Sequence, residues 1–500
     1  MARSSSAAPV APSVRVWPAA LALAALGAAR CGNDCCTVDS EPIPVSRAPL
    51  GQGPALGGAM LARARAPGGD MAFSMVVDTA SPVTILAAPA TTGTLRIMER
   101  GFDLLDGSDP APNPARVRAR FRDLGLFALP LGPVGSPTTL PGGVIGGDLL
   151  HSFSVELRFA AACPGLDGGA AGPGCSSVTF WRHQGATLAF LEDAGYAVLR
   201  FTLFGGGETT AQSPSDFLGL QAPVTLPPSR VVFRACAAPR VFSRTEPREA
   251  CCVRGDEIAR ASGADLSLLL ATGVGPMVLS RSAWARVSAL LPTPPAMTSA
   301  PLLVATWPTV IDATWTTMPR YALLDGFDPP STGDEGPCVD LGRARRLEWT
   351  EAQIAATGQA QPAVGACVQP CDTDPSQSGE ALNSAAYIEL GGAIPVAVVD
   401  DAEPFLQALR FDIRPEGPDI DGLVGAAALG AARVELDYIN DTPRAIFSCE
   451  PAASHDACYA ASRCPRLPDH DHKHLCFGLP AAPEASPGFG LPATCAPSGC

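Results

Sequence analysis

The stretch FSMVVDTASPVTIL, residues 73–86, places a single carboxylate, Asp78, inside an otherwise apolar run. A second stretch, SLLLATGVGPMVLS at residues 267–280, has the same layout but carries Ala271 at the position of the acid. Short apolar runs that end in small residues and a turn are typical of buried strands leading into a tight loop. The two stretches therefore indicate two related halves, of which only the first keeps the acid.

Each stretch is followed, later in its own half, by an apolar–apolar–glycine segment. In the first half this segment opens GGVIGGDLLHSFSVELRF, residues 142–159. In the second half it opens DGLVGAAALGAARVELDYINDTPRAIF, residues 421–447. In both, the glycine leads into a short small-residue or helical segment and then a strand-like run. The same two elements thus occur twice in the same order.

The composition is that of a globular, mainly β protein. The chain has 500 residues, 47% apolar and 17% charged, which excludes wholesale disorder and allows two or three domains. Its 50 glycines and 51 prolines favour short strands and turns over long helices. Helical patterns are few, at residues 280–291 and 401–411. The net charge of −14, without a basic cluster, excludes the phosphate contacts that nucleic-acid binding needs.

The N-terminus has the pattern of an export signal. Two arginines precede the apolar run VWPAALALAALGAA, residues 16–29, which ends in small residues and is short for a membrane span. We expect residues 1–30 to be a signal peptide and the protein to be exported to a bacterial cell envelope or the medium. Cys31 resembles a bacterial lipoprotein site, although Arg30 stands where that family has Gly or Ala. A lipid anchor at Cys31 and plain secretion both remain open.

The cysteines predict disulfide bonds. Seventeen cysteines in an exported chain are typical of a disulfide-bonded protein. Cys163 and Cys175 flank a glycine-rich loop that a bond between them would close. Cys236 is a candidate partner for Cys251 or Cys252.

The strand-like runs divide the chain into two lobes and a tail. We expect an N-terminal lobe over residues 44–210 and a C-terminal lobe over 220–450. A Pro-, Gly- and Asp-rich segment with three cysteines, residues 325–380, predicts a loop insertion in the second lobe. Residues 451–500 form a Cys-rich tail.

The four motifs together resemble those of the pepsin and retropepsin aspartic-protease superfamily. In that family an Asp-Thr/Ser-Gly loop lies beneath an apolar–apolar–glycine segment in each lobe, and the two loops face each other across a cleft. The resemblance covers most of residues 71–450, with its specific content in the four motifs. It implies a bilobal, pepsin-like fold of two related β-barrel lobes.

The resemblance also implies roles for individual residues. Asp78 matches the first catalytic aspartate, and Ala271 occupies a degenerate second catalytic position. Thr79 and Thr272 match the paired threonines whose hydroxyl groups tie the two loops together. Ser81 matches the residue that hydrogen-bonds the outer oxygen of the catalytic carboxylate. These five positions form the predicted site.

The missing acid bears directly on the chemistry. Peptide hydrolysis of this kind needs water between two carboxylates, and their repulsion splits the two pKa values so that one is a base and the other an acid. Loss of a general acid or base typically lowers the rate by about 10²–10⁴-fold. Val274 replaces the hydroxyl residue of the second loop, and Ala80 replaces the glycine of the first. Asp265 and Asp421 are poorly placed to substitute for the missing acid.

Two classes of function remain open. One is an aspartic endopeptidase with activity that depends on Asp78. The other is a pseudoprotease that holds an extended peptide by strand addition, or a structural envelope protein that uses the fold as a scaffold. We expect a peptide or protein ligand, no cofactor and a monomer. A dimer that pairs two first lobes is the least favoured assembly.

A histidine cluster near the C-terminus is a further candidate site. His470, His472 and His474 alternate in DHDHKH, so an extended strand would place them on one face, as metal ligands require. The sequence specifies no fourth ligand, which favours a solvated tail over a metal site.

Overall fold

The computed structural model describes most of both expected lobes. The described residues are 36–47, 58–87, 96–106, 116–129, 131, 141–159, 176–182, 196–201, 203–212, 221–237, 263–291, 293–326, 336–338, 387–412, 419–429, 432–439, 443–449 and 474–478. Several predictions fall outside them: the signal peptide, a lipid at Cys31, the Cys163–Cys175 bond, and His470 with His472. Within these ranges no helix has the length and apolarity to cross a membrane.

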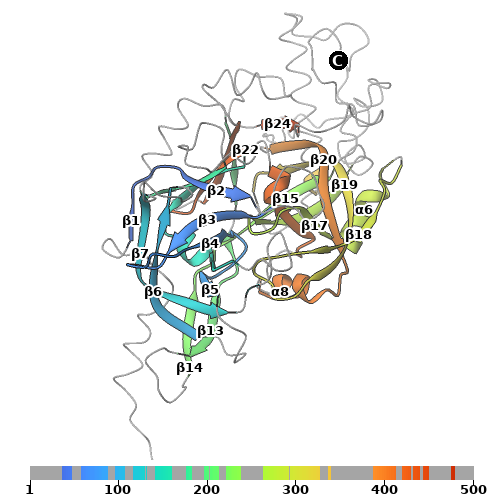
Figure 1. Ribbon diagram of the computed structural model, residues 1–500. Helices are drawn as coiled ribbons and strands as arrows, with labels where there is room; N and C mark the ends of the chain where they lie inside the picture. Colours follow the sequence, from blue (N-terminus) through green and yellow to red (C-terminus); the bar gives the residue numbers. More distant parts are fainter. Residues whose placement is uncertain are drawn as a thin grey trace, which may run out of the picture.

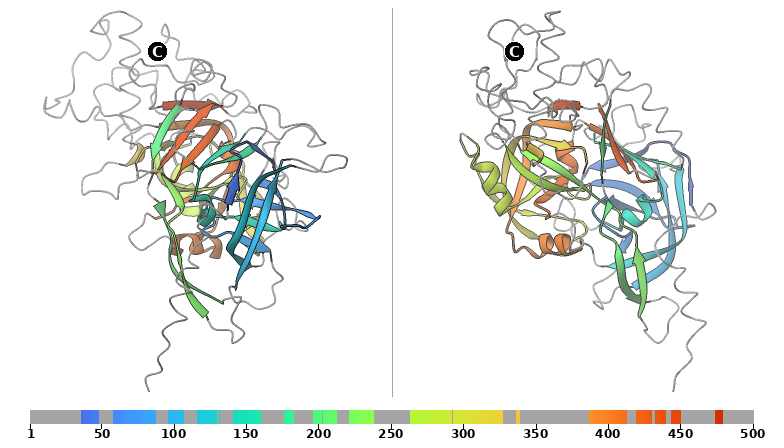
Figure 2. Two further views of the ribbon diagram at one scale, coloured as in Figure 1. Left: turned by 90° about the vertical axis from the view of Figure 1, so that its left-hand side faces the viewer. Right: turned by 180° about the vertical axis from the view of Figure 1, so that it is seen from behind.

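The fold is mainly β and has two lobes, as expected. Two sheets, of 15 and nine strands, lie side by side (Figures 1 and 2). The larger sheet contains β1 (Cys36–Val38), β2 (Ile43–Arg47), β3 (Met60–Arg65), β4 (Ala72–Val77), β5 (Ile85–Ala87), β6 (Arg96–Leu105), β7 (Val117–Leu129), β8 (Gly143–Ile145), β9 (Ser154–Arg158), β10 (Ser177–Trp181), β11 (Tyr196–Arg200), β13 (Gly207–Gln212), β14 (Gln221–Leu226), β22 (Ala432–Asp437) and β23 (Arg444–Cys449).

The smaller sheet is built mostly from the second half of the chain. It contains β12 (Leu203–Phe204), β15 (Arg230–Ala237), β16 (Ala264–Ala271), β17 (Met277–Ser280), β18 (Thr298–Leu302), β19 (Ile311–Leu324), β20 (Tyr387–Val399), β21 (Gly422–Gly425) and β24 (His474–Gly478). The helices are α2 (Gly147–Leu150), α6 (Arg281–Ser288), α8 (Pro404–Asp412) and the 3₁₀ helix η2 (Ala426–Leu429). The helices α6 and α8 confirm the two helical patterns read from the sequence.

Both halves have the same strand pairing around their loops. In the first half β8 pairs in parallel with β4 and antiparallel with β5, and β5 pairs in parallel with β7. In the second half β21 pairs in parallel with β16 and antiparallel with β17, and β17 pairs in parallel with β20. Each apolar–apolar–glycine strand therefore lies between the strands that enter and leave its loop. The internal repeat predicted from the motifs is confirmed by topology.

The halves join at one end of the larger sheet, where both contribute strands. The strand order there is β11-β23-β22-β9-β10-β2, with β22 antiparallel to β9. The sequence VEL occurs in both central strands, and Glu156 lies directly opposite Glu435. Both glutamates are buried, and Arg158 and Arg433 form ion pairs with Glu156. These arginines offset the repulsion that two opposed buried carboxylates would otherwise produce.

The described disulfide differs from the one predicted. Cys236 bonds to Cys338, 102 residues away, and not to Cys251 or Cys252. The carboxylate of Asp265 accepts a hydrogen bond of 2.8 Å from the Cys338 amide, which holds this segment beside β15. Proximity in sequence pointed to a short loop, whereas tertiary packing brings the start of the insertion to the end of β15.

Candidate functional site between the two loops

The two loops are bound to each other through their threonines. The Thr79 hydroxyl donates to the carbonyl oxygen of Leu270 (2.9 Å), and the Thr272 hydroxyl donates to that of Val77 (2.7 Å). Each hydroxyl oxygen also accepts a hydrogen bond from the amide of the other threonine, at 3.1 and 3.3 Å. Both side chains are fully buried. This reciprocal arrangement brings positions 78 and 271 to opposite sides of one junction.

In each half, the glycine that follows the two apolar residues of the motif allows its strand to lie in close contact with the backbone of the loop. A Cβ atom on Gly146 would lie 2.1 Å from the carbonyl oxygen of Val83, and one on Gly425 would lie 1.9 Å from that of Pro276. Any larger residue would push the loop away from its supporting strand. The glycine of each apolar–apolar–glycine motif thus has a steric cause, and it is the same in both halves.

Asp78 is held in the loop by backbone donors. Its side chain is 1% exposed, and Oδ1 accepts hydrogen bonds from the amides of Ala80 (2.9 Å) and Gly273 (3.2 Å). Burial raises the pKa of the Asp78 carboxyl above its ordinary value. The Ala80 and Gly273 amides, the positive charge of Arg230 and the Ser81 amide act in the opposite direction. The acid therefore lies in a buried but prearranged polar setting.

Ser81 supports the loop in a different way from the one expected. Its hydroxyl donates to the carbonyl oxygen of Val83 at 2.8 Å, so its hydrogen is not directed at the Asp78 carboxylate. The Ser81 backbone amide is the group that acts on that carboxylate. Ser81 therefore holds the turn, and backbone groups replace the hydroxyl contact that the resemblance implied.

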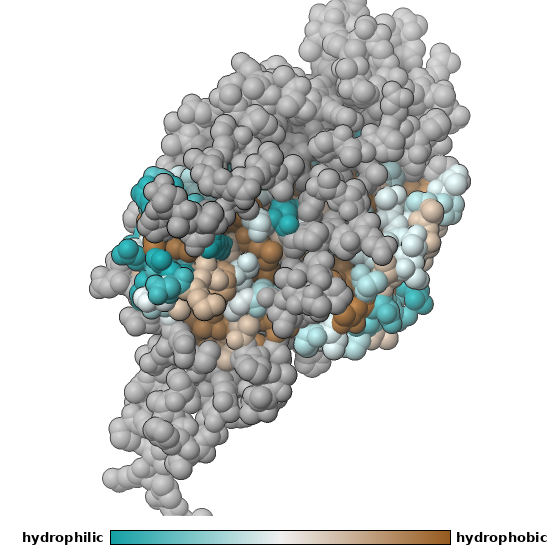
Figure 3. Space-filling model, viewed as in Figure 1, coloured by the Kyte–Doolittle hydropathy of each residue, from teal (hydrophilic) through white to brown (hydrophobic). Residues whose placement is uncertain are grey.

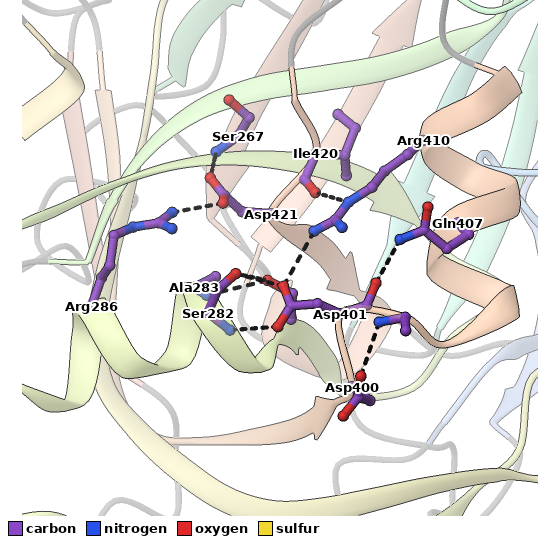
Figure 4. A network of polar contacts seen from close by, with 12 residues as sticks. Ser267, Ser282, Ala283, Arg286, Asp400, Asp401, Gln407, Arg410, Ile420 and Asp421 are labelled. Atoms are coloured by element: carbon purple, nitrogen blue, oxygen red, sulfur yellow. Dashed lines mark hydrogen bonds and ion pairs between the residues drawn. The ribbon is translucent and has the colours of Figure 1, made fainter.

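The second loop presents an apolar surface at the corresponding place. Ala271 and Val274 are buried and pack in one hydrophobic cluster with Ala80 of the first loop. The two nearby acids are engaged elsewhere. The Asp265 carboxylate binds the Cys338 amide, and that of Asp421 binds the Ser267 amide and Arg286 (Figure 4). Neither acid therefore occupies the position opposite Asp78, which Ala271 holds.

Asp148 is a buried acid that the sequence analysis missed. It lies in α2 directly after the two motif glycines and is 2% exposed. Its Oδ1 accepts hydrogen bonds from the Thr84 hydroxyl (2.6 Å) and the Leu149 amide (2.8 Å). The Thr84 oxygen in turn accepts from the Gly146 amide at 3.1 Å. Burial raises the pKa of Asp148 to about 6, although these hydrogen bonds act against the increase.

Arg230 is the second residue that the sequence analysis did not identify. It opens β15, is 3% exposed, and its Nε donates to the carbonyl oxygen of Ala80 at 3.0 Å. Its charge acts on Asp78. The sequence shows only an arginine at the start of an apolar strand, because the contact depends on how the two halves meet.

A cavity of about 200 Å³ opens beside Asp78 and is lined by both halves. Asp78 and Arg230 are the charged residues of its lining, which is otherwise mostly apolar. Hydrophobic residues of both lobes also reach the surface among hydrophilic ones on the face drawn in Figure 3. The apolar lining includes Pro82, Val83 and Leu129 from the first half and Trp307, Phe405 and Leu409 from the second.

The described residues contain no cluster of three or more His, Cys, Asp or Glu that could hold a metal ion. Of the C-terminal histidines, His474 alone is described; it opens β24 and lies opposite Tyr387 of β20. His470 and His472, the other two histidines of this cluster, lie outside the described residues.

Comparison with known proteins finds likeness among solved structures. No family model and no curated protein matches the chain. The crystal structure of an aspartic proteinase from Irpex lacteus has a TM-score of 0.31 and 11% identity, over 82% of this chain and 97% of that one. Basic 7S globulin from soybean has a TM-score of 0.32 and 11% identity, over 83% and 97%. Both TM-scores are too low to support a conclusion about this chain. The description of its fold therefore rests on the internal repeat and on the hydrogen bonds that link the two loops through their threonines.

Proposed function

We propose that this protein is an exported, aspartic-peptidase-like binding protein that holds an extended peptide in the cavity between its loops without efficient hydrolysis. One observation carries the proposal. The loop junction is complete, with Asp78 lining the cavity, but Ala271 and Val274 place hydrophobic surface where a second acid would act.

The chemistry favours binding over turnover. Asp78 has no neighbouring carboxylate to split its pKa, so base and acid forms are not supplied together. Burial raises the pKa of Asp78 in spite of the charge of Arg230, so the neutral form of this lone acid is favoured and it is a poor general base. The carboxylate and the apolar lining can still hold a peptide by hydrogen bonding and burial of a side chain.

Residual hydrolysis through Asp78 is the second candidate function. It is favoured by the position of this acid at the cavity, with two backbone donors that fix its orientation. An Asp78 carboxylate that orients water could act as a general base without a partner acid. The rate would then lack the contribution of the missing acid, about 10²–10⁴-fold.

The test is to incubate the purified full chain with a mixed peptide library between about pH 3 and 7, covering the range in which buried carboxyls titrate. We expect peptides to be retained without cleavage. The matched variants are Asp78→Asn and the double variant Ala271→Asp/Ala80→Gly. Cleavage by the wild type that Asp78→Asn abolishes would establish the peptidase instead. Absence of any retained peptide would leave only a scaffold role.

A further inference from the structure

The turn that joins β18 to β19 contacts both halves of the molecule at the cavity. Val304 packs in a hydrophobic cluster that comes mostly from the second half. Ala305, the next residue, is 1% exposed and belongs to a different cluster, whose other buried members all lie in the larger sheet and its loops. Thr306 and Trp307 then line the cavity itself. Four successive residues of one turn thus link the second half to the first beside Asp78.

The hairpin arm that carries this turn has no counterpart among the described strands of the first half. In the first half β6 pairs antiparallel with β7, as β19 does with β20 in the second. Only residues 88–95 separate β5 from β6, whereas residues 281–310, with α6 and β18, separate β17 from β19. The first half closes around its loop without such an arm. The arm is therefore not part of the backbone arrangement that the two halves need.

The arm, residues 298–313, is anchored at its base. All five residues of β18 pair with β19. The strand β19 pairs with β20 only from Thr314 onward, so the arm extends beyond that pairing. Most residues of β18 are exposed on this edge of the smaller sheet. A hairpin of this kind keeps its own hydrogen bonds when its turn moves.

The turn is held on the first half by little more than one methyl group. Its backbone hydrogen bond, from the Trp307 amide to the Val304 carbonyl oxygen at 3.0 Å, stays within the turn. No hydrogen bond or ion pair between described residues joins residues 303–310 to the first half, and the outer residues 308–310 are exposed. The contact is the side chain of Ala305 in its apolar cluster. Burial of one methyl group is a weak, non-directional contact, and segments with few contacts open most readily.

We propose that this arm is a lid over the cavity and that Ala305 is the latch that holds it on the first half. With the latch in place, Thr306 and Trp307 complete the wall of the cavity beside Asp78. A ligand enters when the latch releases and the turn swings away from the first half. This inference goes beyond the proposed function, because access to the cavity does not depend on which ligand it takes.

The first test measures opening of the turn in the full chain by hydrogen exchange with mass spectrometry. Ala305→Asp would place a carboxylate in the apolar cluster, so residues 303–310 should exchange about tenfold faster or more. Thr309→Asp adds the same charge on the exposed side of the turn and should exchange as the wild type does. Exchange in β4 and β16 should be unchanged in both, which shows that the fold is intact. Equal exchange of the turn in Ala305→Asp and Thr309→Asp would overturn the latch.

A second pair of variants removes only the methyl group of the latch. Ala305→Gly should open the turn less than Ala305→Asp does but more than Thr309→Gly, which controls for the flexibility of glycine. Because neither variant adds a charge, this pair also separates loss of the latch from any electrostatic effect on Asp78. Equal exchange of the turn in the two glycine variants would contradict the role of Ala305.

A further readout measures access to the cavity, which a merely flexible turn would not change. A water-soluble carbodiimide with glycinamide converts carboxyl groups within its reach into amides, and peptide mapping gives the rate at Asp78. At one fixed pH this rate should be about tenfold higher in Ala305→Asp than in the wild type or Thr309→Asp, and should rise less in Ala305→Gly. The exposed Asp400 should be labelled equally in all of them. An unchanged rate at Asp78 in Ala305→Asp would show that the arm does not cover the cavity. Neither measurement uses a peptide, so failure of the lid and failure of peptide binding are distinguished.

Discussion

The two loops and the strands around them have the same backbone arrangement, but they differ in most of their acidic and hydroxyl side chains. Equivalent positions are fixed by equivalent contacts: the Gly147 amide donates to the Ser81 carbonyl, and the Ala426 amide donates to that of Val274. On this alignment Thr79 and Thr272 correspond, but four other polar residues of the first half have apolar counterparts. The pairs are Asp78 with Ala271, Ser81 with Val274, Thr84 with Met277, and Asp148 with Ala427.

What the halves keep in common is what the fold needs. The paired threonines and the close-approach glycines occur in both, because each satisfies buried backbone groups or leaves room for a backbone contact. What the second half lacks is a set of acids and hydroxyls without which the loop still closes. The comparison separates residues that build the junction from residues that serve chemistry at it.

The departure at Ala80 follows from the same comparison. A Cβ on Gly273 would lie 2.4 Å from Cγ of Asp78, so the second loop must have glycine opposite the acid. Ala80 is the counterpart of Gly273, and it packs in the cluster that contains Ala271. With only a methyl group at position 271, there is room for a methyl group at position 80. The two substitutions are therefore physically coupled.

The largest expected effect comes from placing an acid at position 271 alone. Ala271→Asp would bury a carboxylate without a prepared partner, against the Cβ of Ala80, and should lower the free energy of unfolding at pH 7 by about 3–5 kcal/mol. The loss should shrink towards pH 4, where the new acid can be protonated. Urea denaturation at several pH values measures both effects.

The double variant Ala271→Asp/Ala80→Gly sharpens this comparison. The glycine would remove the methyl group that blocks the new carboxylate, so part of the lost stability should return. Equal stability of the single and double variants would show that the two positions are not coupled. Ala80→Gly alone controls for the intrinsic cost of a glycine, about 0.5–1 kcal/mol.

The second prediction is that the two threonines contribute equally to the stability of the junction, as their equivalent contacts suggest. Thr79→Val and Thr272→Val each remove a hydroxyl that donates once and accepts once, which leaves a buried carbonyl and a buried amide unpaired. Each variant should lose about 2–4 kcal/mol of stability, and by similar amounts. Thr79→Ser and Thr272→Ser keep the hydroxyl and are the controls. A large difference between the two valine variants would contradict the symmetry.

The sequence alone predicted the two related halves, because the same motifs occur in each of them. Two copies of an apolar run, a threonine and a later glycine predicted the paired halves, and Thr79 and Thr272 meet as expected. Asp148 was overlooked because an acid after a glycine pair reads as an ordinary helix start. The side chain that donates a hydrogen bond to it, Thr84, lies 64 residues earlier in the chain. Arg230 and Trp307 reach the cavity only through packing between halves, which periodicity does not report.

The disulfide of Cys236 was also predicted wrongly because its partner is set by long-range packing. The pairing of Cys236 was assigned to cysteines near it in sequence, whereas Asp265 holds the distant Cys338 against β15. Local spacing predicts turns and strand ends well, because these depend on neighbouring residues. Contacts across long insertions depend on which surfaces meet, and the sequence carries no local signal for them.

The third effect concerns the acid that only the first half has. The folded-state pKa of Asp148 is raised to about 6, so the fold favours its protonated form. This contribution to stability is fully present below the unfolded pKa of about 3.9 and is lost as pH rises through about 6. Asp148→Asn keeps a neutral hydrogen-bonding group and should stabilise the protein at pH 7 by about 2–3 kcal/mol.

Thermal unfolding between about pH 4 and 7 measures this dependence, with the window set by the two pKa values of Asp148. The wild type should lose stability as pH rises, and Asp148→Asn should lose less. Because burial also raises the pKa of Asp78, the double variant with Asp78→Asn is needed to flatten the curve. Identical curves for the wild type and Asp148→Asn would show that Asp148 does not titrate in this range.

The smallest effect lies in a polar network of the second half, away from its apolar loop. Asp401 accepts hydrogen bonds from the Ser282 hydroxyl and amide at the first turn of α6, and Arg410 of α8 lies 3.8 Å away (Figure 4). Burial raises the pKa of Asp401, but the bonds from Ser282 and Ser280 and the charge of Arg410 outweigh it, so the net shift is downward. The ionised form is thus favoured in the folded protein.

Asp401→Ala should therefore cost about 1 kcal/mol above pH 5, an amount typical of a lost helix-terminal acceptor. The sign is opposite to that of Asp148, because stability from a lowered pKa is present above about pH 3.9 and is lost as pH falls below it. Asp400→Ala is the neighbouring comparison and should cost less, since its side chain accepts one hydrogen bond from the Ala402 amide and otherwise forms an exposed ion pair with Arg281 of α6. If Asp401→Ala changed stability equally at pH 3 and pH 7, its carboxylate would not be the group that anchors α6. The ion pair between Arg286 and Asp421 would then be the charge-dependent contact that holds α6.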